Sequence, residues 1–242
     1  MQKAIIGKKV GMTQIFDESG KVIPVTVIEA GPCVVVQKMT EEKEGYKAVQ
    51  LGYEEVTEKK LSKPEQGHLK KAGVGMVKVL KEFRFKDTDK YEVGDVIKAG
   101  IFAEGDKVDV TGISKGHGYA GVVKRHGQGR TPMTHGGGPV HRHAGSMGSS
   151  ADPSRIMPGK KQAGHMGVDQ VTVQNLDIVK VDPELNIIAI RGAVPGPKGS
   201  IVYIKDTAKV QAVKKGEAAG ISLNPQKASA RVNPQKASAR TK

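Results

Sequence analysis

Short runs of β-branched and apolar residues, separated by polar turn residues, recur along most of the chain. Four runs in the first 60 residues predict strands at 4–6, 22–28, 33–39 and 47–53. Residues 18–20 and 31–32 carry Ser, Gly and Pro and predict turns between these runs. Pro24 has no amide hydrogen to donate, so we expect its strand to begin there or to lie at a sheet edge.

The clearest helix signal follows these strands. Ser62 and Glu65 have the spacing of a capping box, Pro64 falls in the first turn, and Gly73 is a stop signal. The surrounding segment, about 45–92, alternates Glu with Lys and predicts a small α+β excursion from the strand-rich body. Strands are predicted to resume at 77–85, 95–103 and 107–111.

The residues between 111 and 167 interrupt this pattern, because they show no sustained apolar period. Strands are predicted again at 171–173, 176–181, 187–191 and 200–205, with a hairpin turn at 182–186. The interruption is therefore a long irregular loop inserted into a β structure. Short, closely spaced strands with many glycines favour a mainly β fold, with a closed β-barrel body.

Charge divides the chain into the same parts. The segment 111–167 contains eight Lys or Arg against one acid, Asp152, and 205–242 contains nine against two. The remaining residues balance, although the whole chain carries a net charge of +14. We therefore expect a barrel body at 1–110 and 168–206, an extension at 111–167, and a basic tail at 207–242. A neutral body with basic arms is typical of nucleic-acid binding.

The tail ends in a direct repeat, NPQKASAR, at 224–231 and 233–240. Two polar copies are too few to build a solenoid, so we assign the repeat no chemistry and expect the tail to be disordered on its own. The single cysteine excludes an intrachain disulfide and suits a reducing compartment. Without a secretion signal or an 18-residue apolar run, we expect a cytoplasmic protein that does not cross a membrane.

Three enzymatic or metal-binding interpretations fail on context. Residues 116–121 match the GxGxxG string, but we expect no helix directly after it, and no acid appears until Asp152. His135, His141 and His143 have no metal-site spacing, and Cys33 lies in an apolar run as a buried residue would. We therefore predict no catalytic residue, no metal site and no cofactor.

RNA binding explains the composition of the extension better than catalysis or metal binding does. It holds 14 of the 31 glycines, which permit close backbone approach to phosphates, and six of the seven histidines. Arg and Lys supply charge, while His and Tyr119 offer flat faces to unstacked bases. The predicted RNA-binding residues are Lys8, Lys9, Lys115, His117, Lys124, Arg125, His126, Arg130, His135, His141, Arg142, His143, Arg155, Lys160, Lys161 and His165. The alternatives are a solvated flexible loop, a β-barrel enzyme whose loop closes over an anionic substrate, and a free-standing RNA chaperone.

Several motifs, in order along about residues 1–206, resemble one family. They include GKKVGMT at 7–13, KPEQGH at 63–68, VDVTG at 108–112, THG at 134–136, GKK at 159–161 and GAVPG at 192–196. The chain is similar to the universal large-subunit ribosomal protein three family (uL3) in its bacterial form. That resemblance implies a β-barrel on the ribosome surface and an extension that threads the rRNA toward the peptidyl-transferase centre.

The resemblance also implies a non-enzymatic structural constituent of the large subunit. It implies an early role in assembly, with 23S rRNA bound near its 3′ end and large-subunit proteins fourteen and nineteen as neighbours. Family members often carry Trp after the Lys-Arg pair at the tip of the extension, where this chain has His126. Some bacterial members carry a methylated Gln near Ser149-Ser150-Ala151, where this chain has no Gln. We therefore expect no such modification.

Overall fold

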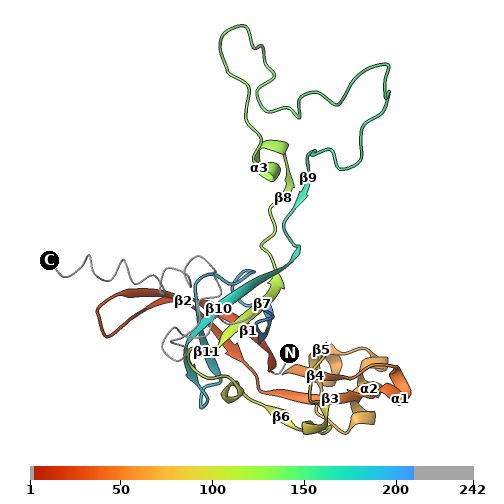
Figure 1. The fold of residues 1–242 in the computed structure, drawn as a ribbon. Coiled ribbons are helices and arrows are strands. Elements are labelled where there is room, and N and C mark those ends of the chain that lie inside the picture. Colours follow the sequence, from red (N-terminus) through yellow and green to blue (C-terminus); the bar gives the residue numbers. More distant parts are fainter. Residues whose placement is uncertain (1–2, 210–242) are drawn as a thin grey trace, which may run out of the picture. The chain divides into compact units, whose positions relative to one another are not determined.

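A closed barrel of six strands forms the body of the computed structural model, which describes residues 3–209 (Figure 1). Its strand order is β1-β12-β7-β10-β11-β2, and every neighbouring pair is antiparallel. The strands are β1 (Ala4–Phe16), β2 (Val22–Ala30), β7 (Lys107–Ile113), β10 (Gln170–Asp182), β11 (Ile187–Arg191) and β12 (Ile201–Asp206). The predicted mainly β fold with a closed barrel is confirmed.

A second sheet of four strands lies beside the barrel, with the strand order β5-β4-β3-β6. Its strands are β3 (Cys33–Met39), β4 (Ala48–Glu55), β5 (Val77–Phe83) and β6 (Val96–Ile97). The helices α1 (Glu41–Glu44) and α2 (Lys63–Ala72) fall between them, as do 3₁₀ turns at Glu58–Lys60 and Thr88–Lys90. The predicted α+β excursion, about 45–92, lies within the segment that forms this sheet.

The cap of α2 follows the predicted sequence signals. The Glu65 carboxylate accepts a hydrogen bond from the Ser62 amide at 2.9 Å, and Ser62 and Glu65 form the capping box. Gly73 ends the helix in the left-handed region at φ 68°, where a side chain would be strained. Leu69 is the fully buried residue of the helix and packs with Val36 and Val77 of the second sheet.

One strand prediction was wrong, and the expectation for Pro24 holds only in part. Residues 95–103 form only the two-residue β6 and a 3₁₀ turn at Ala99–Ile101, closed by a hydrogen bond from the Phe102 amide to the Ala99 carbonyl. Ala-Gly at 99–100 has no β-branched side chain to favour extended backbone. The strand of Pro24 does not begin there, because β2 starts at Val22, and β2 as a whole pairs with both β1 and β11, but at Pro24 itself only β1 pairs with it. Pro24 lies one residue beyond the part of β2 that β11 pairs with, so its missing donor costs no ladder bond.

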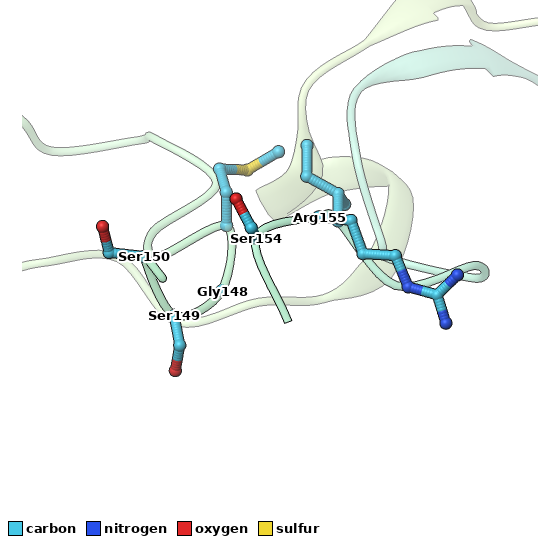
Figure 2. A pocket seen from close by; sticks show the side chains of 7 residues that line it. Gly148, Ser149, Ser150, Ser154 and Arg155 are labelled. Atoms are coloured by element: carbon cyan, nitrogen blue, oxygen red, sulfur yellow. The ribbon is translucent and has the colours of Figure 1, made fainter. Parts of the chain in front are cut away.

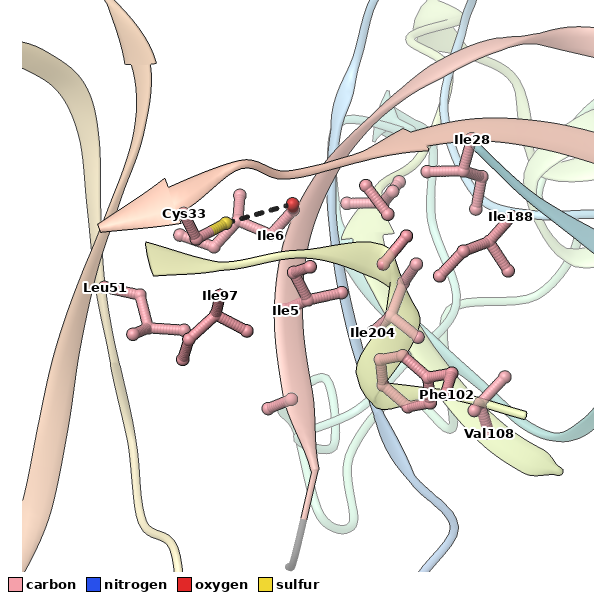
Figure 3. Packing of buried hydrophobic residues seen from close by; sticks show 14 of the residues in the cluster. Ile5, Ile6, Ile28, Cys33, Leu51, Ile97, Phe102, Val108, Ile188 and Ile204 are labelled. Atoms are coloured by element: carbon pink, nitrogen blue, oxygen red, sulfur yellow. Dashed lines mark hydrogen bonds between the residues drawn. The ribbon is translucent and has the colours of Figure 1, made fainter. Parts of the chain in front are cut away.

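One hydrophobic core joins the barrel to the second sheet (Figure 3). Ile28, Ile188 and Ile204 come from barrel strands, and Cys33 and Leu51 come from the second sheet. Residues 4–6 of β1 are all fully buried, because the strand packs against the barrel interior on one face and the second sheet on the other. This two-sided burial explains why the run is continuously apolar and not alternating.

Cys33 is part of this core and its thiol is 3.4 Å from the Ile6 carbonyl oxygen, to which it donates (Figure 3). Burial raises the pKa of the thiol to about 12. We therefore expect no reaction with iodoacetamide at pH 8 in the native protein and full alkylation in 6 M guanidinium, because the thiolate is the nucleophile. Mass spectrometry would measure this, and rapid native alkylation would contradict the buried placement.

Among residues 3–209, no helix has the length and apolarity needed to cross a membrane.

Candidate nucleic-acid interface

The extension continues directly from two neighbouring barrel strands, β7 and β10. β7 and β10 pair up to Ile113 and Gln170, and the Ser114 amide then donates to the Asp169 carbonyl at 2.9 Å. The ladder continues in a two-stranded ribbon of β8 (Gly118–Ala120) and β9 (Gly164–Met166). The base of the extension is therefore ordered by the barrel sheet, as Figure 1 shows between β7 and β8.

Gly167 makes this ribbon possible at the point where its two chains come closest. Its φ is 83°, and a Cβ there would overlap the carbonyl oxygen of Lys115. Only glycine meets both conditions without moving the backbone. The glycine richness of the segment thus has a local structural reason at this position, besides any role in RNA contact.

A short helix, α3 (Val122–His126), packs back on the ribbon. Arg125 donates from Nη1 to the Gln162 carbonyl oxygen at 3.0 Å, and Nε2 of His126 lies 3.0 Å from the same oxygen. Gly164 leaves room for the guanidinium, since a Cβ there would lie 2.6 Å from Nη1. Ala120 of β8 and Val122 of α3 are both buried. The Arg125 and His126 side chains are thereby fixed relative to the returning chain at Gln162.

The expectation that no helix follows the GxGxxG string was wrong, because α3 begins directly after Gly121. Five residues between two glycines are too few to show a helical period. The dinucleotide interpretation still fails on context. The strand before α3 belongs to an antiparallel two-stranded ribbon, whereas a dinucleotide site needs a parallel βαβ unit.

A cleft of about 440 Å³ lies where α3 faces the ribbon. Five of the predicted RNA-binding residues line it, together with Asp169: Lys115, His117, Arg125, His126 and His165. On the ribbon, Tyr119 pairs with His165, so both side chains lie on one face, and Tyr119 is 81% exposed. Cations beside an exposed aromatic pair are what a phosphate chain with unstacked bases needs.

Of the other predicted RNA-binding residues of the extension, Lys124 lies exposed on α3, and the outer loop, 127–163, holds the remaining eight: Arg130, His135, His141, Arg142, His143, Arg155, Lys160 and Lys161. All are exposed except His141, which is half-buried. Lys160 donates to the Ser146 carbonyl at 2.6 Å, and the Thr131 amide donates to the His141 carbonyl at 3.3 Å. These bonds hold separate turns of the loop, and they do not gather its cations into one cluster.

A hollow of about 240 Å³ in this loop is lined by Gly148, three serines, Arg155, Met147 and Ile156 (Figure 2). Figure 2 shows the Arg155 side chain running away from Ser149 and Ser150. No histidine or acid lines the hollow to activate a serine, so it offers no nucleophilic chemistry. Across the described part of the chain, no three His, Cys, Asp or Glu side chains are grouped as metal ligands would be.

The body and the extension differ in how many of their charged side chains form ion pairs. The eight ion pairs among the described residues all lie in the body, for example Lys3–Asp106 at 2.8 Å and Lys107–Asp177 at 3.4 Å. None of them involves the eight Lys and Arg residues of 111–167. The body thus neutralises many of its own cations, while those of the extension are left to bind an external anion.

Two predicted RNA-binding residues lie outside the extension, on β1. Lys8 is half-buried and pairs with Glu54 at 3.3 Å, and this lysine's hydrogen bond lowers the pKa of the Glu54 carboxyl. Lys9 is buried, and its Nζ donates to the carbonyl oxygens of Val194 at 2.7 Å and Gly196 at 2.9 Å. Lys9 therefore holds the turn at 192–199 in place, and we leave it out of the proposed RNA contacts.

His126 also differs from its expected position. The resemblance places the matching side chain at the tip of the extension, but here His126 ends α3 and the loop 127–163 follows it before the chain returns. Sequence reasoning missed α3 and the ribbon pair of Tyr119 with His165. The glycines at 121 and 127 on either side of the basic run were the available signal. The basic tail lies outside the described residues from 210 onward.

A barrel body that carries an arm of unpaired cations defines a class of polyanion-binding protein. The family model of ribosomal protein L3 matches residues 56–186, which is more than half of the chain and includes the whole extension. The chain belongs to the ribosomal protein L3 family. It is thus a structural protein of the large ribosomal subunit that binds rRNA.

Proposed function

We propose that the extension is the principal contact with 23S rRNA and that it runs toward the peptidyl-transferase centre. The protein would act early in large-subunit assembly in the cytoplasm, without catalysis, beside large-subunit proteins fourteen and nineteen. Binding would use Lys8 and all the predicted extension residues from Lys115 to His165. The observation that carries the proposal is the set of Lys and Arg residues without ion pairs on an extension whose ribbon continues the barrel sheet.

The mechanism follows from the order within the extension. The ribbon and α3 are already fixed by hydrogen bonds, so RNA binding need not order them from a random coil. Ordering costs roughly 1–2 kcal/mol of backbone entropy per residue, which the outer loop would offset by phosphate contacts. The cleft between α3 and the ribbon would receive phosphates, while Tyr119 and His165 would stack on bases.

Sucrose-gradient fractionation tests the place of the protein in the cell. We expect nearly all of the chain to sediment with the large subunit and its precursors. Sedimentation of most of the protein away from these particles would contradict the proposal. It would favour a free RNA chaperone or an enzyme.

A photo-reactive side chain at position 126 tests the destination of the extension. In assembled large subunits, we expect a conjugate with 23S rRNA that maps to nucleotides near the peptidyl-transferase centre. His126 lines the cleft, so its position reports on the RNA bound there. Conjugates that map only to distant nucleotides would contradict the proposed path.

Two substitutions separate stacking from charge in the extension. Tyr119→Ser should weaken rRNA binding by about 1–3 kcal/mol without changing its salt dependence, because a lost stack releases no counterions. The exposed Lys124→Gln should instead lower the salt slope by roughly 0.7–0.9 per phosphate contact. Filter binding across a salt series measures both. An unchanged affinity of the Tyr119→Ser variant would show that Tyr119 does not stack, and an unchanged slope of the Lys124→Gln variant would show that Lys124 does not contact a phosphate.

A further inference from the structure

The hairpin of β1 and β2 extends past the barrel and exposes an apolar face. Pairing places Met12 with Thr26, Gln14 with Pro24, and Phe16 with Val22, so these six residues share one side of the ribbon. Met12 is 55% exposed, Phe16 63% and Val22 47%. Three large apolar side chains on one face of a narrow ribbon are more than the isolated exposures normal at a protein surface.

The outer edge of β1 in this hairpin is free as well, whereas on the β2 side the Pro24 carbonyl accepts from the Gly192 amide at 2.9 Å. β12 pairs with β1 only from Ala4 to Lys8, and β11 pairs with β2 only from Val25 to Glu29. Among the described residues, no strand pairs with the outer edges beyond those points. Backbone donors and acceptors of residues 11–16 on that side are thus available to a partner.

The charge of the hairpin distinguishes it from the extension. Residues 10–25 carry two acids, Asp17 and Glu18 at the tip, and one base, Lys21. A phosphate backbone would be repelled by this acidic tip and would gain little from the apolar face. A second copy of the chain would bring another acidic tip against it. A protein surface with an apolar patch and basic side chains at its border fits both features.

We infer that this face docks another protein of the large subunit, one that offers an apolar patch bordered by Lys or Arg. The inference rests on the proposed assembly into the large subunit. Phe16 and Val22 are the central contacts, Met12 extends them toward the barrel, and Asp17 and Glu18 meet the basic border. The hairpin then holds the body against a protein neighbour, while the extension holds it against the RNA.

The test places p-benzoylphenylalanine at position 16 of the full chain and irradiates gradient-purified large subunits. We expect a conjugate with another large-subunit protein that survives ribonuclease. The conjugated peptide should be apolar, with Lys or Arg within a few residues. A ribonuclease-sensitive conjugate with rRNA, a conjugate with a second copy of this chain, or no conjugate from assembled subunits would overturn the inference.

Leu185 supplies the matched control, because it is 66% exposed in the turn between β10 and β11 without apolar neighbours of this kind. The same photo-reactive residue at position 185 should not yield the conjugate seen from position 16. With the label at 16, Met12→Ser and Val22→Ser together should lower the yield at least about tenfold, as loss of central interface contacts does. An unchanged yield would contradict the inference. Failure of every labelled chain to enter large subunits would instead overturn the proposed function itself.

Discussion

Replacing residues 115–168 by Asn-Gly should leave the barrel folded and lower the affinity for 23S rRNA at least ~100-fold at moderate salt. Ser114 and Asp169 are already hydrogen-bonded partners at the end of the β7–β10 ladder, so a two-residue turn can join them. The core residues all come from outside the deleted segment, which explains the retained fold. The lost affinity reflects the removal of eight unpaired cations.

Circular dichroism and filter binding measure the two halves of this prediction. A control variant with Lys59, Lys60 and Lys63 replaced by Gln removes exposed charge from the helical segment between β4 and β5 and should bind nearly as well as the wild type. Unfolding of the shortened chain would show that the extension belongs to the core. Near-normal binding by the shortened chain would show that the body carries the RNA contact.

Lys9→Met should lower the free energy of unfolding by about 2–3 kcal/mol. The substitution keeps most of the side-chain volume but leaves the carbonyl oxygens of Val194 and Gly196 without their donor. Lys8→Met, one residue away, should cost less than about 1 kcal/mol, because Lys8 is partly exposed and its pair with Glu54 is screened by solvent. Urea unfolding compares the two variants. Equal losses in the free energy of unfolding would show that the hydrogen bonds of Lys9 to the turn at 192–199 do not stabilise the fold.

The Lys9 prediction also has a pH dependence. Burial, and secondarily the charge of Lys115, lowers the pKa of Lys9 below its ordinary value. Between the lowered and the ordinary pKa the unfolded chain binds more protons, so this group's contribution to stability increases as the pH rises through that window. The Lys9→Met variant should lack this increase. An identical alkaline profile in both proteins would show that the Lys9 pKa is unperturbed.

Much of the barrel could be predicted because its signals are local. β-Branched runs separated by turn residues located β3 and β11 within their observed bounds, and the Ser62–Glu65 spacing located the start of α2. The split of charge between body and extension was also visible in the sequence. In the structure, many of the balanced charges of the body form ion pairs with one another.

Other features depend on contacts between distant residues, and the sequence does not show them. Lys9 lies in a basic string that looks like a phosphate-binding site, but its partners at Val194 and Gly196 are about 185 residues away. The outer half of β1 carries mixed polar and apolar residues and becomes a strand only because β2 pairs with it. α3 is too short for a periodic signal and is held by Gln162 from the far side of the loop.

The salt dependence of binding to 23S rRNA tests the central claim most directly. If the extension and its basic neighbours neutralise about ten phosphates, the logarithm of the binding constant should fall against the logarithm of the salt concentration with a slope of roughly −7 to −9. The chain shortened at 115–168 should lose most of that slope. A slope near zero for the full chain, or equal slopes for both chains, would contradict the account.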